Sequence, residues 1–379
     1  MAGFLLKGFE VELFTGVMSG EHIGVSDDVM RTFNDFVIEP DKRNLEYITE
    51  PSLDYLLLKE SLLSPRRRLR SWLDKHNLTI LPGSTLTFGN SKQFQRSDPS
   101  NKYHEFIELN YGTRVVTTSV HINIGITNMV QLFAALRLVR CEAALFLALS
   151  ASSPFLDGYI TGYHSQRWVQ FPRTPSQVPL FLDHQHYVKW IEEQLKQGSM
   201  HNERHLWTSV RPNGPQRPNK LNRLELRICD LITNCDLLLA VTALLELRLI
   251  SLFKNPKLLD PFFASQLKKE QLSQISDLNE DAAAKSSLDA TLHHWIDGKE
   301  IVCRDWIYEL LQEVLPLAKK MKIEHLLSPI YTVLEKGNQS MQWLNSYSDS
   351  KSLQNIFQET IKVMEKEEAV SSQTFQDLS

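Results

Sequence analysis

Carboxylates and other polar side chains recur at every second position in four short segments of the chain. The positions between them carry mostly apolar side chains such as leucine, isoleucine and valine. The polar set is rich in glutamate, arginine, histidine and asparagine and contains no lysine, an unusual composition for a face that only contacts water. The polar positions are Glu10 and Glu12 in 9–13, Glu46 in 44–48, Ser119, His121 and Asn123 in 119–124, and Arg223, Glu225 and Arg227 in 223–228.

The spacing of these side chains suits a site for divalent metal ions. Successive side chains of a strand point to opposite faces, so each segment offers one apolar and one polar face. Glu10 and Glu12 would lie roughly 6 to 7 Å apart at ~3.3 Å per residue, a separation that can serve two ions. Carboxylate oxygens with one imidazole favour Mg²⁺ or Mn²⁺ over zinc. Any half-exposed antiparallel strand shows the same alternation, so a solvated sheet face is the alternative.

Strands and turns around two helices are predicted for residues 1 to about 125, and mostly helices for the rest of the chain. Residues 129–149 are strongly apolar but contain two arginines and a glutamate, which favours a buried helix over a membrane span. Residues 150–180 and 208–222 are irregular and rich in glycine, proline and serine. Their length makes them candidate active-site loops.

Composition excludes several classes of protein. The chain has 41 basic and 45 acidic residues, a formal charge of −4, which disfavours a nucleic-acid or membrane-surface partner. The first residues lack the basic and apolar regions of a signal peptide. The four cysteines show no CxxC spacing, so neither a disulfide framework nor a zinc site is expected. A reducing cytoplasm is the expected location.

Two histidine patterns and one basic run are set aside. His201 and His205 lie one helical turn apart, but the HExxH order of a zinc peptidase is absent. The pattern from Asp183 to His186 also lacks further ligands. Residues 65–70 (Pro-Arg-Arg-Arg-Leu-Arg) have no interleaved aromatic residues, which favours a solvated helix face over nucleic-acid contact.

An ordered set of motifs carries a family resemblance. The four segments occur in one order along the first 240 residues, with Ser-Ala-Ser-Ser-Pro at 150–154 and Ser-Val-Arg-Pro at 209–212 in the loops between them. Together they resemble the glutamate–cysteine ligase family, in particular its cyanobacterial type. The motifs are Gly-Phe-Glu-Val-Glu at 8–12, Glu39 with Asn-Leu-Glu-Tyr-Ile-Thr-Glu-Pro at 44–51, Ser-Val-His-Ile-Asn-Ile-Gly at 119–125 and Arg-Leu-Glu-Leu-Arg-Ile-Cys-Asp at 223–230.

The resemblance implies an α+β fold in which a curved antiparallel sheet forms a funnel flanked by helices, similar to the catalytic sheet of glutamine synthetase. It implies a catalytic region over 1–254. A helical C-terminal region over 255–365 is expected to pack on it, followed by a frayed tail over 366–379.

The implied activity is ATP-dependent ligation of L-glutamate to L-cysteine through an acyl phosphate, giving γ-glutamylcysteine, ADP and phosphate in the first step of glutathione synthesis. The implied cofactor is Mg²⁺, with Mn²⁺ as an alternative. A related carboxylate–amine ligase with another acceptor amine is one alternative function. A relative that binds nucleotide or amino acid without turnover is another.

Site residues also follow from the resemblance. Arg227 would face the transferring phosphate, Glu225 would act beside it, and Asn123 would contact nucleotide or substrate. From their place in the loops, Arg167 and Arg211 are candidates for binding substrate carboxylates, with a surface ion pair as the alternative. The implied metal ligands are Glu10, Glu12, Glu39, Glu46, His121 and Glu225.

Overall fold

The computed structural model describes residues 3–349 and 351–376. Among them, seven strands form one antiparallel sheet in the order β2-β3-β1-β5-β9-β8, with β4 beside the end of β1. The predicted α+β class is confirmed, and the sheet does not close into a barrel. The strands are β1 (Lys7–Gly16), β2 (Phe36–Ile38), β3 (Asn44–Ile48), β4 (Thr79–Leu81), β5 (Val120–Gly125), β8 (Val210–Asn213) and β9 (Arg223–Leu226).

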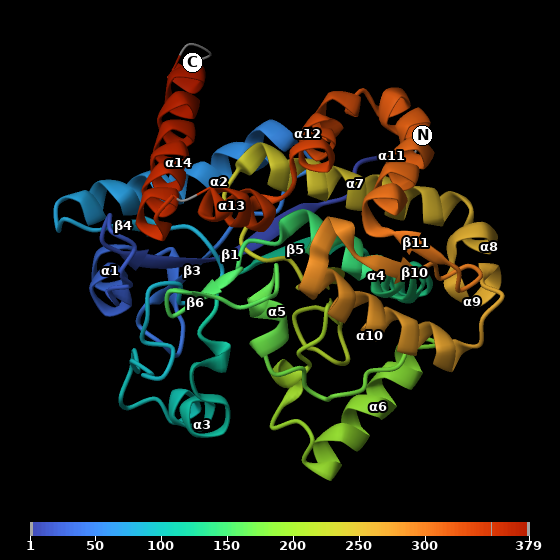
Figure 1. The fold of residues 1–379 in the computed structure, drawn as a ribbon. Helices are drawn as coiled ribbons and strands as arrows, with labels where there is room; N and C mark the ends of the chain where they lie inside the picture. Colours follow the sequence, from blue (N-terminus) through green and yellow to red (C-terminus); the bar gives the residue numbers. More distant parts are fainter. Residues whose placement is uncertain (1–2, 350, 377–379) are drawn as a thin grey trace.

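Helices flank the sheet and fill the second half of the chain (Figure 1). Helix α14 stands at one end of the molecule, and α3 and α6 lie at the other. Two small hairpins are separate from the main sheet: β6 (Phe155–Leu156) with β7 (Tyr159–Ile160), and β10 (Thr291–His293) with β11 (Glu300–Val302). The α-helices are α1 (Ser26–Thr32), α2 (Tyr55–Asp74), α3 (Lys102–Tyr111), α4 (Met129–Ser150), α5 (Gln166–Gln170), α6 (His184–Gln197), α7 (Cys235–Lys254), α8 (Pro256–Leu259), α9 (Pro261–Ala264), α10 (Lys269–Ser286), α11 (Cys303–Met321), α12 (Ser328–Lys336), α13 (Gln339–Ser348) and α14 (Leu353–Gln376).

The apolar face of the sheet is buried beneath helices α2 and α4, and α7 packs on both of these helices. Phe9, Val11 and Ile122 point into this core and are at most 1% exposed. The period of two in the sequence therefore identified the strands and the face that each one buries. Because burial fixes this face, the opposite face must carry the glutamates and His121.

Helix α4 is the buried helix predicted from residues 129–149. Its charged side chains are paired inside the protein: Arg137 with Asp260 of the loop between α8 and α9, and Glu142 with Arg248 of α7. Paired charges can be buried where unpaired ones cannot. Among the helices of the described residues, none has the length and apolar character needed to cross a membrane.

Helix α2 differs from the solvated basic face expected for residues 65–70. Arg66 is 1% exposed and donates to the carbonyl oxygen of Thr233 at 2.7 Å. Arg70 is also buried and pairs with Glu368 of α14. These acceptors lie far away in the sequence, so the local pattern could not reveal them.

The same contacts bear on the tail that was expected to fray from residue 366. Helix α14 continues to Gln376, and residues 377–379 lie outside the described residues. Glu368 pairs with Arg70, and Glu367 accepts a hydrogen bond from the backbone amide of Cys235 at 2.8 Å. Partners on α2 and α7 therefore hold residues 367 and 368, and the expected fraying of the tail stays a prediction.

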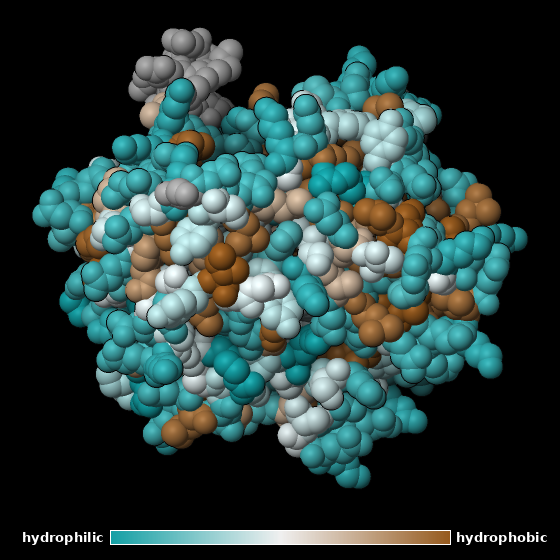
Figure 2. Space-filling model, viewed as in Figure 1, coloured by the Kyte–Doolittle hydropathy of each residue, from teal (hydrophilic) through white to brown (hydrophobic). Residues whose placement is uncertain are grey.

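One hydrophobic core runs across the expected boundary at residues 254 and 255, from Phe9 of β1 to Met364 of α14. The four cysteines are buried and free, as expected for a chain without a disulfide framework. The face of the molecule in Figure 2 is mostly hydrophilic, with hydrophobic residues in separate patches. The division into a catalytic and a C-terminal region stays a prediction.

A buried ion pair fixes the start of β1, the strand that carries Glu10 and Glu12. Lys7 and Glu246 of α7 are both fully buried, and their charged atoms lie 2.9 Å apart. Glu246 also accepts hydrogen bonds from the hydroxyl of Tyr55 and the backbone amide of Leu5. This carboxylate therefore joins β1 to α2 and α7.

Replacing Glu246 by leucine should lower the free energy of unfolding by about 3 to 5 kcal/mol, because the ammonium group of Lys7 would stay buried without its partner. The double variant Lys7→Met, Glu246→Leu should recover most of that loss, since neither charge is then present. Urea denaturation followed by circular dichroism measures both. A double variant that is less stable than Glu246→Leu would contradict this account.

Candidate active site

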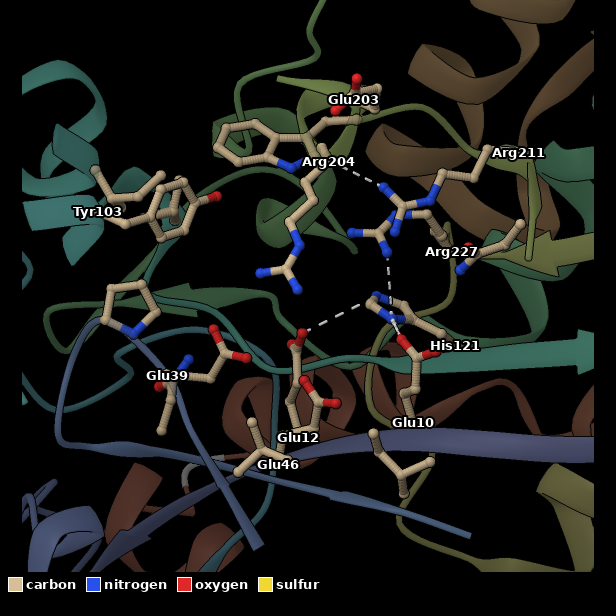
Figure 3. Close-up of a pocket in the computed structure, with 18 of the residues that line it drawn as sticks. Glu10, Glu12, Glu39, Glu46, Tyr103, His121, Glu203, Arg204, Arg211 and Arg227 are labelled. Carbon is tan, nitrogen blue, oxygen red and sulfur yellow. Dashed lines mark hydrogen bonds and ion pairs between the residues drawn. The ribbon is translucent and has the colours of Figure 1, made fainter. Parts of the chain in front are cut away.

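A cavity of about 840 Å³ opens on the polar face of the sheet. Side chains of β1, β3 and β5 form its floor, and residues 203–217 form much of the facing wall (Figure 3). Cavities of this size enclose ligands as large as drug molecules. The glutamates of the floor and the arginines of the wall point toward one another across this space.

Glu10, His121 and Glu225 form the first group of candidate ligands. Strand pairing places Glu10 directly opposite His121, and Asn123 opposite Glu225. Nδ1 of His121 lies 3.0 Å from a carboxylate oxygen of Glu10 and 3.8 Å from one of Glu225. One ligand atom from each residue lies within 4.8 Å of the other two.

Glu12, Glu39 and Glu46 form the second group. Glu12 lies opposite Glu46 in the pairing of β1 with β3. Glu39 follows the end of β2, and its carbonyl oxygen accepts a hydrogen bond from the hydroxyl of Ser97. One carboxylate oxygen of each glutamate lies within 4.8 Å of the others. All six predicted ligands thus lie on one face of the sheet.

Ser119 and His121 connect the two groups. The Ser119 hydroxyl donates to Glu12 at 2.8 Å and lies 3.1 Å from Nε2 of His121. Nε2 of His121 is 4.0 Å from Glu12, while Nδ1 faces Glu10. The imidazole is 4% exposed, so its orientation is fixed by these contacts.

The two groups differ in charge compensation. Burial, the charge of Glu12 and other nearby carboxylates raise the pKa of Glu39 to about 7. Burial and the charge of Glu39 likewise raise the pKa of Glu46 well above its usual value. Burial also opposes ionisation of Glu10, but the hydrogen bond and charge of His121 and the charge of Arg227 outweigh it and lower the pKa of Glu10. In the second group, the charge of Arg227 does not outweigh burial and the mutual repulsion of the acids.

Two arginines neutralise Glu225, which is fully buried. Arg211 binds it with two hydrogen bonds, from Nε at 2.8 Å and Nη2 at 3.0 Å. Arg227 donates to Oε1 of the same carboxylate, which Nη2 of Arg211 also contacts. Burial would raise the pKa of Glu225, but these charges hold it well below its usual value. The arrangement fixes the guanidinium of Arg227 at the edge of the cavity.

Arg167 and Arg211 line the cavity, whereas Asn123 is not part of its lining, and all three are held by contacts within the protein. Arg167 donates to the carbonyl oxygens of Arg227 and Ile228, both at 3.1 Å. Nδ2 of Asn123 donates to Glu10 at 3.2 Å, and its Oδ1 accepts from Arg223 at 3.0 Å. The substrate-binding roles of Arg167, Arg211 and Asn123 stay predictions.

The sequence analysis missed Glu203 and Arg204, which line the cavity between the two histidines set aside as a zinc pattern. Those histidines pack instead: His201 stacks on Phe106 with ring centres 4.2 Å apart, and Nε2 of His205 lies 2.9 Å from the hydroxyl of Tyr103. Neither belongs to a candidate metal group among the residues that the structure describes. The dense aromatic and histidine content of the segment was a signal of packing.

The donor set of both groups fits a hard divalent cation. Each group offers carboxylate oxygens, with one imidazole nitrogen in the first, and Mg²⁺ and Mn²⁺ prefer such ligands. The raised pKa values of Glu39 and Glu46 show that the second group cannot hold its full negative charge unaided. A cation there would relieve that repulsion.

Sequence comparison gives curated relatives of this chain. It is 26% identical over 284 residues to a protein of Thermobifida fusca named "Putative glutamate--cysteine ligase 2", covering 74% of this chain and 68% of that protein. A Bradyrhizobium protein of the same name is 30% identical over 220 residues, which cover 57% of this chain and 52% of that protein. The chain therefore spans between half and about two thirds of these relatives.

Solved structures share the fold. A glutamate–cysteine ligase from Francisella tularensis, in complex with AMP, matches with a TM-score of 0.71 at 15% identity, covering 100% of this chain and 95% of that one. A bifunctional glutathione synthetase from Pasteurella multocida also gives 0.71, at 13% identity, with 97% and 53% covered.

The family comparison covers nearly the whole chain. The model of glutamate–cysteine ligase family 2 matches residues 6–368, a range that contains every strand of the sheet and all six candidate ligands. The resemblance found in the sequence is thereby confirmed, and the chain belongs to glutamate–cysteine ligase family 2.

Proposed function

We propose that this protein joins the γ-carboxylate of glutamate to the amine of cysteine, using ATP and releasing ADP and phosphate. Its family supports a carboxylate–amine ligase, and the finer assignment is our proposal. The observation that carries it is the pair of three-ligand groups side by side on the sheet, with the guanidinium of Arg227 beside the first group at the edge of the same cavity. The AMP bound to the Francisella ligase of the same fold supports a nucleotide substrate.

The proposed chemistry explains the need for both signs of charge. A γ-carboxylate oxygen attacks the γ-phosphorus of ATP, ADP leaves, and the product is an acyl phosphate. The cysteine amine then attacks the acyl carbon, phosphate leaves, and the amine loses a proton. ATP and the carboxylate repel each other, so the reaction needs cations that hold them in line.

The chain's own residues would divide these tasks. Glu10, His121 and Glu225 would hold one ion and Glu12, Glu39 and Glu46 another, and bound Mg²⁺ would neutralise and orient the phosphate oxygens. The planar guanidinium of Arg227 suits the oxygens of the transferring phosphate. Its pairing with Glu225 preorganises it, so little reorganisation is needed at the moment of transfer.

Two alternatives are separated by experiment. A ligase with another acceptor amine would use the same candidate metal ligands on the floor of the cavity, because the acyl phosphate forms before the amine attacks. A binding protein without turnover is disfavoured because such a relative tends to lose metal ligands, whereas all six candidate ligands are present here in two groups.

Purified protein should form ADP only when glutamate, Mg²⁺ and an acceptor amine are all present, because the acyl phosphate requires the first two and turnover requires the third. A coupled ADP assay with cysteine, 2-aminobutyrate, methylamine and ammonia measures this, and mass spectrometry identifies the product. Release of ADP at a rate indifferent to glutamate would sink the proposal. A faster reaction with an amine other than cysteine would favour the first alternative.

Glu12→Gln should reduce Mg²⁺-dependent turnover by roughly 100-fold or more, because the amide keeps the shape but removes one ligand charge. Without Mg²⁺ the variant should melt at the same temperature as wild type or above it, since one crowded charge is gone. Mg²⁺ with nucleotide should raise the melting temperature of wild type more than that of the variant.

Glu335→Gln is the matched control, because Glu335 is an exposed glutamate on α12. It should keep both the wild-type turnover and the wild-type shift in melting temperature with Mg²⁺ and nucleotide. A Glu12→Gln protein that behaves like this control would remove Glu12 from the site.

A further inference from the structure

Two charged side chains of the cavity wall have no use in the chemistry described so far. Glu203 and Arg204 lie in a short 3₁₀ turn, Glu203–His205, that precedes β8. Both line the cavity, with Arg204 exposed and Glu203 half-buried. Within residues 3–349 and 351–376, neither charged group has a hydrogen-bond or ion-pair partner.

Four of the five other arginines that line the cavity are already engaged, and the fifth, Arg217, has no hydrogen-bond partner for its Nε and Nη1 atoms among the described residues. Arg211 and Arg227 bind Glu225, Arg167 donates to two carbonyl oxygens, and Arg223 donates to asparagine oxygens. In Figure 3 the guanidinium of Arg204 extends from the wall into the cavity, above Glu12 and His121. Arg204 can therefore give its donors to a ligand without breaking a contact of the folded protein.

The position of the turn is fixed even though its charges are free. The carbonyl oxygen of Arg204 accepts a hydrogen bond from Arg211 at 3.1 Å. On either side, His201 stacks on Phe106, and His205 packs against Trp207 with ring centres 4.9 Å apart. A backbone held in this way presents Glu203 and Arg204 at a constant place in the wall, as a recognition site requires.

We propose that Arg204 and Glu203 bind the α-carboxylate and the α-ammonium group of the glutamate substrate. This proposal rests on the proposed function and names the groups that would recognise the acid to be activated. A guanidinium and a carboxylate on adjacent residues complement the two opposite charges of an α-amino acid. The γ-carboxylate would then point away from the wall toward the candidate metal ligands of the floor.

The chemistry of the alternatives favours glutamate as the ligand of this pair. A polyphosphate chain would be repelled by the carboxylate of Glu203, and the floor already offers sites for phosphate-binding cations. The amine of cysteine must lose its charge to attack, so a fixed carboxylate that stabilises an ammonium group would oppose that step. The amine of glutamate does not react and can stay charged throughout.

The test is calorimetric titration of amino acids into the protein with Mg²⁺ and a non-hydrolysable ATP analogue present. The probes are L-glutamate, its α-amide, which lacks the α-carboxylate charge, and N-acetyl-L-glutamate, which lacks the ammonium charge. Wild type should bind glutamate about 10- to 100-fold more tightly than the α-amide, as expected for one charge-assisted hydrogen-bonded pair.

Arg204→Gln should weaken glutamate binding by that factor and leave the affinity for the α-amide within about threefold, so the preference disappears. Glu203→Gln should remove the preference for glutamate over N-acetyl-L-glutamate in the same way. Arg31→Gln is the matched control, since Arg31 is an exposed arginine of α1 whose side chain is 73% accessible. It should bind all three probes like wild type, and circular dichroism verifies that each variant is folded.

Three results would overturn the proposal: wild type that binds no glutamate, an Arg204→Gln protein that keeps the preference over the α-amide, or one that loses affinity for the ATP analogue instead. The ligase assay distinguishes this failure from failure of the proposed function. If Arg204 controls glutamate binding but ADP formation ignores glutamate, the recognition site stands and the ligase assignment fails. If ligation occurs and Arg204→Gln binds glutamate normally, the reverse holds.

Discussion

The mutual repulsion of carboxylates on one face of the sheet is the constraint on which the site depends. Strand pairing brings Glu12 opposite Glu46 and Glu10 opposite His121, although like charges directly across strands are destabilising. The opposite face offsets this cost, because its apolar side chains pack under α2 and α4. A register shift of one residue would expose that apolar face to the cavity and bury the glutamates. Packing of the core therefore stabilises a strand register that the repulsion between the carboxylates alone would disfavour.

The two ligand groups answer this repulsion in different ways. The first contains positive charge from the protein itself, since Arg211 and Arg227 flank Glu225 and lower its pKa. The second has only acids, and the pKa of Glu39 rises to about 7 through burial and the charge of Glu12. The positive charge of an arginine is a permanent part of the protein, whereas the positive charge of a metal ion is present only while the ion is bound. The second group is therefore the part of the site whose charge state responds most to a cation.

Much of this site could be predicted because the determining patterns are local. A period of two identifies a strand and its faces within five or six residues, which is why β1, β3, β5 and β9 and their polar residues followed from the sequence. Glu39 lies outside a strand, and only the family resemblance indicated it. Arg66 was expected on a solvated helix face, but its acceptor, the carbonyl of Thr233, is 167 residues away. No local pattern encodes such a partner.

The histidines of the 201–205 segment show how the same residues can have two interpretations. Their spacing allows a metal, but His205 is fully buried among aromatic rings, and burial together with the charge of His201 lowers its pKa to about 4. A neutral imidazole in such a stack contributes to packing and offers no positive charge to anions in the cavity. The positive charge of the segment then belongs to Arg204, whose backbone is fixed by the stacked rings and by Arg211 while its guanidinium stays free. A residue that recognises a ligand must present a free charge at a fixed position, as Arg204 does. The arginines bound to Glu225 differ, because their charges are already paired within the protein.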